Sequence, residues 1–344
     1  MNTVTVNASR TYDILIGSRL LSRLGAETAK LGNVKSVCIV SDTNVWPLYG
    51  KIAKDSLEDS GFSVTSFVFP AGEASKNSST YLNLLNFLAQ SKLTRSDLIV
   101  ALGGGVVGDL AGFAAASYLR GIRFVQVPTT LLAAVDSSVD GKTAIDLPAG
   151  KNLAGAFWQP SLVLCDTDTL NTLSSDIFRD GCAEVIKYGI LYDPVLFDHL
   201  EKQGLQFDRE AVIARCVELK RDVVMEDEFD NGARMKLNLG HTIGHGVEAK
   251  SAFSISHGCS VAIGTAIVCR ASHCRDTDRI LSLLNKFGLP TNTAYRAEEL
   301  VSYTLSDKKR SAGTISLIIP EAIGYCHIVP TPIEKLKSFI EAGL

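Results

Sequence analysis

The sequence predicts an N-terminal Rossmann-like α/β domain built on a parallel sheet, followed by a mostly α-helical C-terminal domain. In the first half of the chain, short continuous apolar segments are separated by segments with helical character, which is typical of parallel strands covered by helices on both faces. After Asp166 the apolar residues recur with the period of a helix. The 344 residues are enough for two domains. We expect the α/β domain at 1–166 and the mostly helical domain at 167–344.

The expected elements follow in order along the chain. Strands are expected within residues 34–45, 62–70, 96–119, 121–135 and 161–166. The third of these runs from its strand through glycines into a helix of small residues, and the fourth runs through a proline turn into another helix. In the second half, helices are expected within residues 176–203, 209–228, 240–270 and 279–287, followed by a strand pair at 314–330.

The composition argues against several classes of function. Hydrophobic residues make up 46% of the chain and charged residues 21%, as in an ordinary globular protein. A net charge of -3 without a basic run argues against a nucleic-acid or membrane-surface partner. The first residues lack the basic and apolar regions of a secretion signal, and the apolar run 261–269 is too short to cross a bilayer. Eight scattered cysteines indicate reduced thiols, and so a cytoplasmic protein.

A glycine-rich turn follows one of the expected strands. The segment LGGGVVGDL contains the pattern G-x-G-x-x-G at Gly103, Gly105 and Gly108. Such glycines let the backbone approach a pyrophosphate, and the following helix offers N–H donors, although a tight structural turn would explain the same pattern. Asp42, where the first strong strand ends, is placed to bind a ribose hydroxyl. We therefore favour dinucleotide binding, but not by the ordinary fingerprint.

A second polar region contains the segment DSSVDGKT, which ends like a Walker-type phosphate-binding loop. Asp136 stands where that motif requires glycine, and its charge would repel phosphates, so we reject this interpretation. The neighbouring polar residues Lys142, Lys151 and Asn152 form either a solvated loop or a wall around a polar ligand. Arg120 and Arg123 could add to an anion pocket.

Candidate metal ligands occur in the second half of the chain. Glu184 and Lys187 lie three apart on an otherwise apolar helix, which indicates either an internal ion pair or a carboxylate aimed at a metal. Three of the six histidines, His241, His245 and His257, fall within a short stretch. Two or three imidazoles with one carboxylate suit Zn²⁺ with an open coordination position. The spacing alone does not choose among the three histidines.

Taken together, these segments resemble the 3-dehydroquinate synthase family over most of the chain, from GEASK at 72–76 to DKK at 307–309. The specific blocks are GGGVVGDLAGF, YLRGIRFVQVPTTLLAAVDSSVDGKTAID, GKNLAGAFWQP, GCAEVIKYGI, RMKLNLGHTIGHGVEA and SHG. The resemblance implies a lyase of the shikimate pathway, which leads to chorismate and aromatic amino acids. The expected reaction converts 3-deoxy-D-arabino-heptulosonate 7-phosphate to 3-dehydroquinate and phosphate. Its steps are transient oxidation by NAD, elimination of phosphate, re-reduction, ring opening and an intramolecular aldol closure.

The resemblance also implies that 1–166 is an NAD-binding domain and 167–344 a metal- and substrate-binding domain, and it implies the site residues. The metal, Zn²⁺ or Co²⁺, would be held by Glu184, His241 and His257. NAD would be held by Asp42, Glu73, Lys76, Gly104, Gly105, Val106, Asp109, Thr129, Thr130, Lys142, Lys151, Thr169, Leu170, Asn171 and Thr172. The substrate would be held by Arg120, Asp136, Lys142, Asn152, Lys187, Lys220, Arg234, Asn238, His245 and Lys308. Those expected to take part in catalysis are Lys142, Lys187, Lys220, Arg234, Asn238 and His245. A homodimer is the family expectation.

One position departs from the family pattern. The family usually reads S-V-G-G-K-T, whereas this chain has Asp140 before Gly141, which places a negative charge beside Lys142. Sister sugar-phosphate cyclases that make valiolone or inosose rings share the metal and NAD sites but vary the substrate contacts. The residues that match the dehydroquinate branch are Asn152, Lys220, Asp227, Arg234 and His245.

Two more distant functions are weighed against this one. A metal-dependent polyol dehydrogenase of the glycerol dehydrogenase type would release NADH and would not need a Lys/Arg cluster for a phosphate and a carboxylate. A non-catalytic nucleotide-sensing module would need the glycine turn, but Glu184, His241 and His257 would then have no task.

Overall fold

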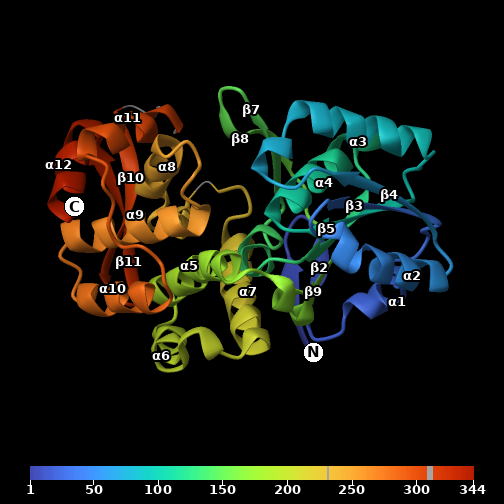
Figure 1. Cartoon of the computed structure of the whole chain (residues 1–344), viewed down its shortest axis with the longest axis horizontal. Helices are drawn as coiled ribbons and strands as arrows, with labels where there is room; N and C mark the ends of the chain where they lie inside the picture. Colours follow the sequence, from blue (N-terminus) through green and yellow to red (C-terminus); the bar gives the residue numbers. More distant parts are fainter. Residues whose placement is uncertain (231, 308–312) are drawn as a thin grey trace. The chain divides into compact units, whose positions relative to one another are not determined.

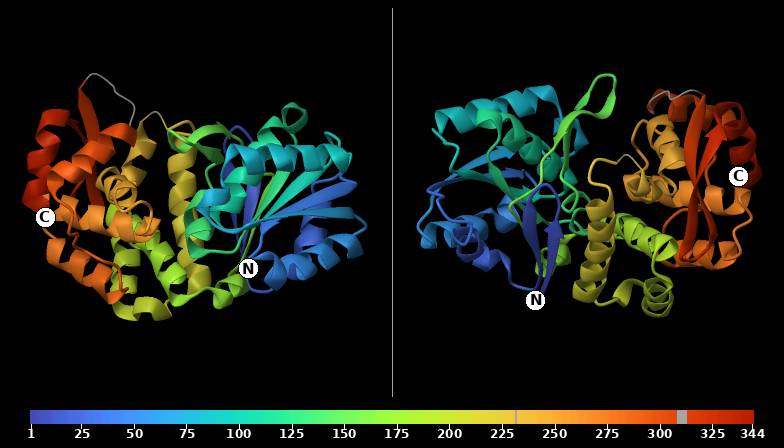
Figure 2. Two further views of the ribbon diagram at one scale, coloured as in Figure 1. Left: turned by 45° about the horizontal axis from the view of Figure 1, so that its top comes forward. Right: turned by 180° about the vertical axis from the view of Figure 1, so that it is seen from behind.

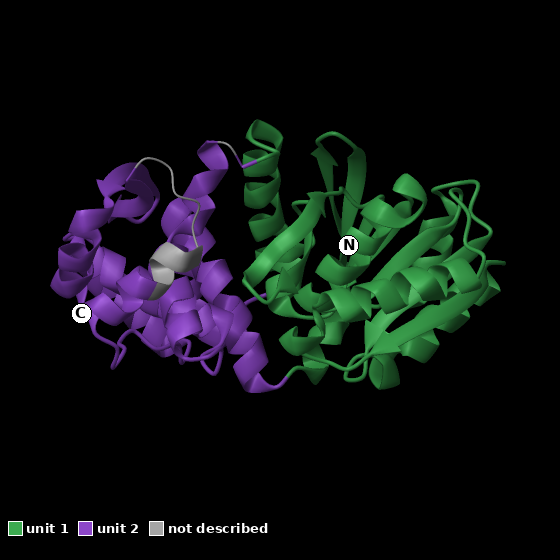
Figure 3. Ribbon diagram, turned by 90° about the horizontal axis from the view of Figure 1, so that it is seen from above, with its two compact units in different colours: residues 1–173, 209–229 green, residues 174–208, 230–344 purple. Residues whose placement is uncertain are grey.

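The computed structural model describes residues 1–230, 232–307 and 313–344, and the chain divides into two compact units (Figure 1 and Figure 3). The first unit comprises Met1–Leu173 and Arg209–Phe229, and the second comprises Ser174–Asp208 and Asp230–Leu344. The first contains a mostly parallel sheet, and the second is mostly helical. The predicted fold class is therefore confirmed.

The division is not a single cut after residue 166. Helix α7 (Arg209–Glu226) belongs to the first unit, although α5 and α6, which precede it, belong to the second. The buried face of α7, which includes Val212 and Val217, packs against strand β1 and the turn Ala133–Ser137. Helical periodicity identifies such a face in the sequence, but it does not say which element the face will contact.

The first unit is built on a seven-stranded sheet with the order β1-β2-β9-β6-β5-β3-β4. Its strands are β1 Asn2–Asn7, β2 Thr11–Gly17, β3 Ser36–Asp42, β4 Ser63–Phe69, β5 Leu98–Gly103, β6 Arg123–Pro128 and β9 Leu162–Asp166. Only β1 is antiparallel to its neighbour. Strands β1 and β2 were not predicted, although β1 alternates polar and apolar residues, which is typical of a half-buried strand, and β2 contains the apolar run Ile14–Ile16.

Helices cover both faces of this sheet (Figure 2). They are α1 Leu24–Ala29 and α2 Lys51–Asp59 on one face, and α3 Ser78–Gln90 and α4 Gly105–Ser117 on the other. Successive residues of β3 serve the two cores in turn: Val37 and Ile39 pack with α1 and α2, whereas Cys38 and Val40 pack with α3 and α4. A strand that is buried on both faces reads as a continuous apolar run, which is why β3 was predictable.

The stretch between β6 and β9 forms the hairpin β7 Lys142–Leu147 and β8 Gly150–Phe157. It projects from the sheet as a two-stranded antiparallel ribbon (Figure 2). The sequence was compatible with a loop here, because β8 is rich in glycine and alanine and buries little. Short 3-10 or π turns that carry site residues are Glu73–Ser75, Tyr118–Arg120, Ala133–Ser137, Thr167–Thr172 and Ala233–Asn238.

The second unit packs its helices around α9 (His257–Ala271), which contacts α5, α8, α10, α12 and β10. The other elements are α5 Ser175–Leu191, α6 Pro194–Gln203, α8 His241–Lys250, α10 Thr277–Lys286, α11 Ala297–Asp307, α12 Ile333–Gly343 and the hairpin β10 Thr314–Ala322 and β11 Tyr325–Pro332. Helix α9 is apolar all round, as a central helix requires. The predicted strand pair is confirmed. Among the described residues, no helix has the length and apolarity to cross a bilayer.

Two helical stretches that the sequence joined are each two helices. The stretch 176–203 is interrupted where the side chain of Asp193 caps α6 and Pro194 begins it. The stretch 240–270 is interrupted at residues 251–256, between α8 and α9. The second interruption lets α8 and α9 fold back on each other.

Arg123 is a structural residue, contrary to the expectation that it adds to an anion pocket. Its guanidinium donates to the carbonyls of Leu31, Gly32, Asn33 and Ser96 at 2.7–3.3 Å. These carbonyls belong to the loops that precede β3 and β5, so Arg123 ties the amino ends of neighbouring strands together. Arg120, in contrast, is exposed on the turn Tyr118–Arg120.

We expect Arg123→Ala to lower the free energy of unfolding by about 2 kcal/mol, because four carbonyl acceptors lose a charged donor. Urea denaturation at equilibrium measures this change. Arg120→Ala is the control, and its stability should stay within about 0.5 kcal/mol of the parent, as for most exposed positions. Equal losses in the two variants would contradict the structural role of Arg123.

Candidate functional site

Most residues that were expected to bind NAD lie at one edge of the sheet in the first unit. Strands β3, β4, β5, β6 and β9 run in the same direction, so their carboxyl ends share this edge. Asp42 ends β3, the glycine turn follows β5, Thr129 and Thr130 follow β6, and Thr169–Thr172 follows β9. The strand order reverses between β3 and β5, because the chain passes from β3 to β4 and returns to pair β5 with β3. Open α/β sheets bind ligands at such a reversal.

The glycine turn holds the first turn of α4 close to its surroundings. A Cβ at Gly104 would lie 3.1 Å from the methyl carbon of Thr130, and a Cβ at Gly108 would lie 2.5 Å from the amide oxygen of Gln126. Within the described part of the chain, no side chain caps α4 at Gly104. The hydroxyl of Thr129 is buried and has no hydrogen-bond partner among the described residues. The open N–H groups and this hydroxyl fit a phosphate-containing cofactor.

Lys76 connects the sheet edge to the β7–β8 hairpin. Its ammonium contacts the carboxylate of Asp109 and the side-chain oxygen of Asn152. Glu73 lies 4.0 Å from Lys76 and 3.7 Å from Lys151. Burial raises the pKa of Asp109 to about 6 in spite of the adjacent Lys76. Burial lowers the pKa of Lys76, but the charges of Asp109 and Glu73 outweigh burial and leave it above its ordinary value. Four expected cofactor residues and Asn152 therefore come together.

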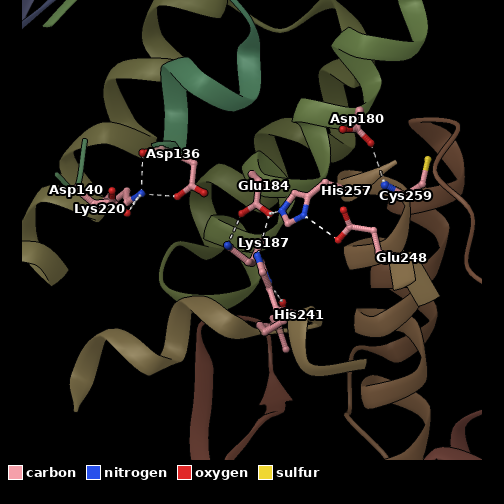
Figure 4. Close-up of polar contacts among 11 residues, drawn as sticks. Asp136, Asp140, Asp180, Glu184, Lys187, Lys220, His241, Glu248, His257 and Cys259 are labelled. Carbon is pink, nitrogen blue, oxygen red and sulfur yellow. Dashed lines mark hydrogen bonds and ion pairs between the residues drawn. The ribbon is translucent and has the colours of Figure 1, made fainter. Parts of the chain in front are cut away.

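Lys220, on α7, is buried beside two aspartates (Figure 4). Its ammonium donates to the carboxylate and to the backbone carbonyl of Asp136, each at 2.6 Å. The carboxylate of Asp140 lies 2.7 Å from the same nitrogen. The structure thus joins Asp136 and Lys220, both expected substrate residues, and adds Asp140, which the sequence placed only beside Lys142.

In the second unit, Glu184, His241 and His257 converge from three helices, α5, α8 and α9 (Figure 4). The Nε2 atoms of His241 and His257 lie 3.5 and 3.4 Å from Oε1 of Glu184. Lys187, one turn along α5, contacts the other oxygen of Glu184. The internal ion pair that the Glu184–Lys187 spacing indicated is therefore present, and it lies against the imidazoles of the expected metal ligands.

These three residues fit a divalent metal ion. Glu184 is fully buried, and neither of its oxygens accepts a hydrogen bond of good geometry from a residue that the structure describes. With bonds of about 2.0–2.1 Å, ligand atoms on a tetrahedral zinc lie about 3.3–3.4 Å apart. The 3.4 and 3.5 Å separations match this spacing. Two imidazoles and one carboxylate are also the donor set of catalytic zinc sites with an open position.

Oxygen atoms on the far side of each imidazole orient the rings. The Nδ1 atom of His241 lies 3.0 Å from the carbonyl of Leu239, so Nδ1 carries the proton and Nε2 offers a lone pair to a metal. The Nδ1 atom of His257 lies 3.7 Å from the carboxylate of Glu248. Such outer partners hold ligand rings in place and raise their basicity.

The charges around Glu184 keep it ionised. Burial opposes ionisation, but Lys187, followed by His241 and His257, holds the pKa of Glu184 well below its ordinary value. Burial and the neighbouring Lys187 lower the pKa of His241 well below its ordinary value, so this ring is neutral. Burial lowers the pKa of His257 too, but the carboxylates of Glu184 and Glu248 raise it to about 10. A positive charge is therefore favoured between the two carboxylates, as at a cation site.

Close backbone packing of α8 against α9 brings the two histidines together. A Cβ at Gly264 would lie 2.0 Å from the carbonyl of Gly240, and a Cβ at Gly244 would lie 2.8 Å from that of Ser260. Gly240 itself has a φ of +75°, which only glycine adopts readily, and it starts α8 directly before His241. Larger residues would separate the helices and the imidazoles.

Asp180 fixes the start of α9 against α5. Its carboxylate accepts hydrogen bonds from the hydroxyl of Ser256 and from the backbone N–H of Cys259, the latter at 3.0 Å (Figure 4). Asp180 lies one helical turn before Glu184 on α5, and Ser256 directly precedes His257. The capping interaction therefore sets the position of His257 relative to Glu184.

His245 lies one turn after His241, with the two ring centres 5.6 Å apart. Its ring centre is 6.3 Å from that of His257. His245, Glu248 and His257 also approach closely enough to form a second group of potential ligands. This second group lacks the fully buried carboxylate between two imidazoles, so the first group fits a metal better.

The remaining expected substrate residues occupy several places. Arg234 is buried and Asn238 half-buried on the turn Ala233–Asn238, directly before α8. Lys142 is exposed at the start of β7. Lys308 lies outside the described residues.

Sequence reasoning missed the supporting roles of Asp180 and Glu248. Glu248 follows His241 by seven residues, two helical turns, and so shares its helix face. That spacing was a usable signal. Asp180 had only its position one turn before Glu184 as a signal, because its partners lie on another helix.

Sequence comparisons identify close relatives along nearly the whole chain. The N-terminal and C-terminal family models of 3-dehydroquinate synthase match residues 66–180 and 181–310. The chain is 46% identical over 351 residues to the 3-dehydroquinate synthase of Pelobacter propionicus, covering 98% of each chain. It is 42% identical over 352 residues to that of Streptococcus suis, covering 98% of this chain and 99% of the relative.

Solved structures share the fold. A 2-deoxy-scyllo-inosose synthase complexed with carbaglucose-6-phosphate, NAD⁺ and Co²⁺ has a TM-score of 0.89 at 25% identity, with both chains fully covered. A 2-epi-5-epi-valiolone synthase from Streptomyces hygroscopicus with NAD⁺ and Zn²⁺ has a TM-score of 0.88 at 25% identity, with 98% of each chain covered. The glycerol dehydrogenase of Schizosaccharomyces pombe has a TM-score of 0.66 at 20% identity, covers 96% of this chain and 88% of its own, and indicates a shared fold only.

We expect His257→Ala to lose its bound metal, because it removes one of three ligands, and His245→Ala to keep it. Atomic emission spectroscopy of the dialysed proteins measures the metal content per chain. An empty site in His245→Ala would show that the ligand set is wrong.

We expect Gly264→Ala to weaken zinc binding at least about tenfold, because the added methyl group forces α9 away from α8. Competition with a chromophoric chelator measures the affinity. Gly343→Ala is a matched control, since its Cβ would meet the carbonyl of Ile267 at 2.2 Å near the far end of α9. That variant should lose stability and keep its zinc affinity; equal zinc affinities in the two variants would contradict the role assigned to the helix crossing.

Proposed function

Because the chain belongs to the 3-dehydroquinate synthase family, we propose that it converts 3-deoxy-D-arabino-heptulosonate 7-phosphate to 3-dehydroquinate and inorganic phosphate. It is thus a carbon–oxygen lyase of the shikimate pathway. The overall change combines transient oxidation, phosphate elimination, re-reduction, ring opening and aldol closure. The observation that carries the proposal is the buried Glu184 carboxylate facing two imidazoles, in a chain that matches this family along nearly its whole length.

The enzyme uses NAD and a divalent metal ion, Zn²⁺ or Co²⁺. When bound, NAD takes a hydride from the substrate and returns it, and the metal ion lowers the pKa of the substrate hydroxyl that is oxidised. Glu184, His241 and His257 would hold the metal. The carboxyl edge of the sheet would hold NAD, with Asp42 at a ribose hydroxyl and the first N–H groups of α4 at the pyrophosphate.

The substrate is a sugar acid phosphate, so two of its groups are anionic. The expected cationic and amide side chains would bind them: Arg120, Lys142, Lys187, Lys220, Arg234, Asn152 and Asn238. Lys187, Lys220 and Arg234 are buried and held by neighbouring groups. Such donors need little reorganisation when negative charge develops on the departing phosphate, which makes their stabilisation effective.

Lys187 and His245 would act near the oxidised carbon. The ammonium of Lys187 rests on the Glu184 carboxylate, so it is held beside the metal ligands and can donate to a substrate oxygen. His245 lies beside His241 without being needed as a ligand. We assign to it substrate binding or the transfer of a proton.

The nearest alternatives are sister sugar-phosphate cyclases. They share the fold, but at 25% identity, whereas the dehydroquinate synthases share 42–46%. Glycerol dehydrogenases share the fold at 20% identity or less. The expected cations Arg120, Lys142 and Arg234 favour an anionic substrate over glycerol.

We place the enzyme in the cytoplasm as a homodimer, without a nucleic-acid or membrane partner. All eight cysteines are free thiols, as expected of a reducing compartment. The net charge of -3 offers nucleic acid no general attraction. The dimer is expected from the family.

We expect the purified protein, supplied with NAD and Zn²⁺, to release one phosphate per dehydroquinate formed, without net NADH. Coupled phosphate detection and absorbance at the NADH band measure both quantities. His257→Ala should reduce kcat by at least about a hundredfold, because removing a metal ligand removes the charge stabilisation it supports. Stoichiometric NADH from glycerol without phosphate release would indicate a polyol dehydrogenase instead.

A further inference from the structure

The ammonium of Lys220 is fully engaged in the substrate-free enzyme. A lysine ammonium has three N–H donors. Among the residues that the structure describes, three oxygen atoms lie at hydrogen-bond distance from Lys220: the carbonyl and the carboxylate of Asp136, each at 2.6 Å, and the carboxylate of Asp140 at 2.7 Å (Figure 4). An incoming oxyanion must therefore replace one of these acceptors.

Asp140 is the acceptor that can be replaced most simply. Asp136 provides two oxygens, one from its backbone, whereas Asp140 provides one. The other oxygen of Asp140 accepts the backbone N–H of Lys142 at 3.0 Å, across Gly141, whose φ is +66°. A Cβ at Gly141 would lie 2.7 Å from the side chain of Gln159, so the turn at residues 140–142 packs closely against Gln159.

The carboxylates of Asp136 and Asp140 share the ammonium of Lys220. One ammonium lies between two carboxylates, and both Asp140 and Lys220 are buried, which limits screening by water. The negative charge of Asp140 also acts on Asp109: it adds to the increase in the pKa of Asp109 that burial causes. The carboxylate of Asp140 therefore competes with an approaching anion for the ammonium of Lys220.

We propose that Asp140 is a positioning and specificity-determining residue, which occupies the third N–H of Lys220 until an oxyanion of the substrate displaces it. The inference rests on the proposed function, because Lys220 is one of its substrate-binding residues. The carboxylate acts as an internal competitor: it keeps Lys220 oriented with Asp136 and raises the substrate concentration that the enzyme needs. Either the carboxylate or the phosphate of the substrate has the chemistry to replace it.

Two substitutions separate the charge of Asp140 from its turn. Asp140→Asn removes the charge and keeps a side-chain oxygen that can accept the N–H of Lys142. Asp140→Gly removes both and restores the residue that the family usually has. Asp97→Asn is a control in the same unit, because Asp97 is also buried and bonds to backbone N–H groups of Ser36 and Thr94, far in sequence from Lys220.

In both Asp140 variants we expect KM for the heptulosonate phosphate to fall about tenfold, equivalent to about 1.4 kcal/mol. Because Asp136 still holds Lys220, kcat should stay within about threefold of the parent. The Kd for NAD, measured by fluorescence titration, should change by less than about twofold, since a shift confined to substrate binding leaves the cofactor unaffected. Asp97→Asn should leave KM unchanged.

Each outcome decides a different question. An inactive parent enzyme would remove the proposed function, and the inference with it. An active parent with an unchanged or higher KM in both Asp140 variants would overturn the inference alone. A lower KM in Asp140→Gly but not in Asp140→Asn would assign the effect to the turn and overturn the competition by charge. Thermal unfolding of each variant confirms that folded proteins are compared.

Discussion

The ionisation of one buried carboxylate, Glu184, is the constraint on which the second unit depends. A charge taken out of water costs many kcal/mol unless opposite charge and hydrogen bonds compensate it. Lys187 supplies one positive charge from the same helix, and His241 and His257 turn their Nε2 atoms towards the carboxylate. Three helices must therefore meet closely. Glycines at the crossing of α8 and α9 and the Asp180 cap at the start of α9 make this approach possible.

Buried lysines play the corresponding role in the first unit. Lys76 joins Asp109 to Asn152, and Lys220 joins Asp136 to Asp140. In each case a lysine paired with a carboxylate links parts of the chain that are distant in sequence. Lys76 connects the sheet edge to the β7–β8 hairpin, and Lys220 connects α7 to the turn Ala133–Ser137. Lys76, expected at NAD, and Lys220, expected at the substrate, are thus both positioned by structural ion pairs. In our proposal, Asp140 makes the second of these pairs depend on whether an anion is present.

Local sequence patterns predicted the parts of the fold whose signals are local. Strands β3 and β5 are buried on both faces and appear as continuous apolar runs, and α5 and α10 show helical periodicity. Strand β1 and the β7–β8 hairpin are half-exposed and carry weaker signals, whereas β2 was not predicted although most of its residues are buried. The expectation that Arg123 adds to an anion pocket was wrong, because its guanidinium binds four backbone carbonyls from distant loops. Every residue has a backbone carbonyl, so no sequence pattern marks these acceptors.

The sequence by itself determined the chemistry of this protein: its family, the Glu184–Lys187 spacing, and three histidines of which two or three would suit a metal. His241 and His245 lie one turn apart on α8, so helical spacing puts both on a similar face and cannot choose between them. The family resemblance implied His241, and the tertiary structure supplies a physical reason for that expectation. The backbone contact between Gly240 and Gly264 places His241, and not His245, with His257 around Glu184. The tertiary structure also decided that the carboxylate of Asp140 contacts the ammonium of Lys220, because this contact depends on how α7 packs and not on the neighbours of Asp140 in the chain.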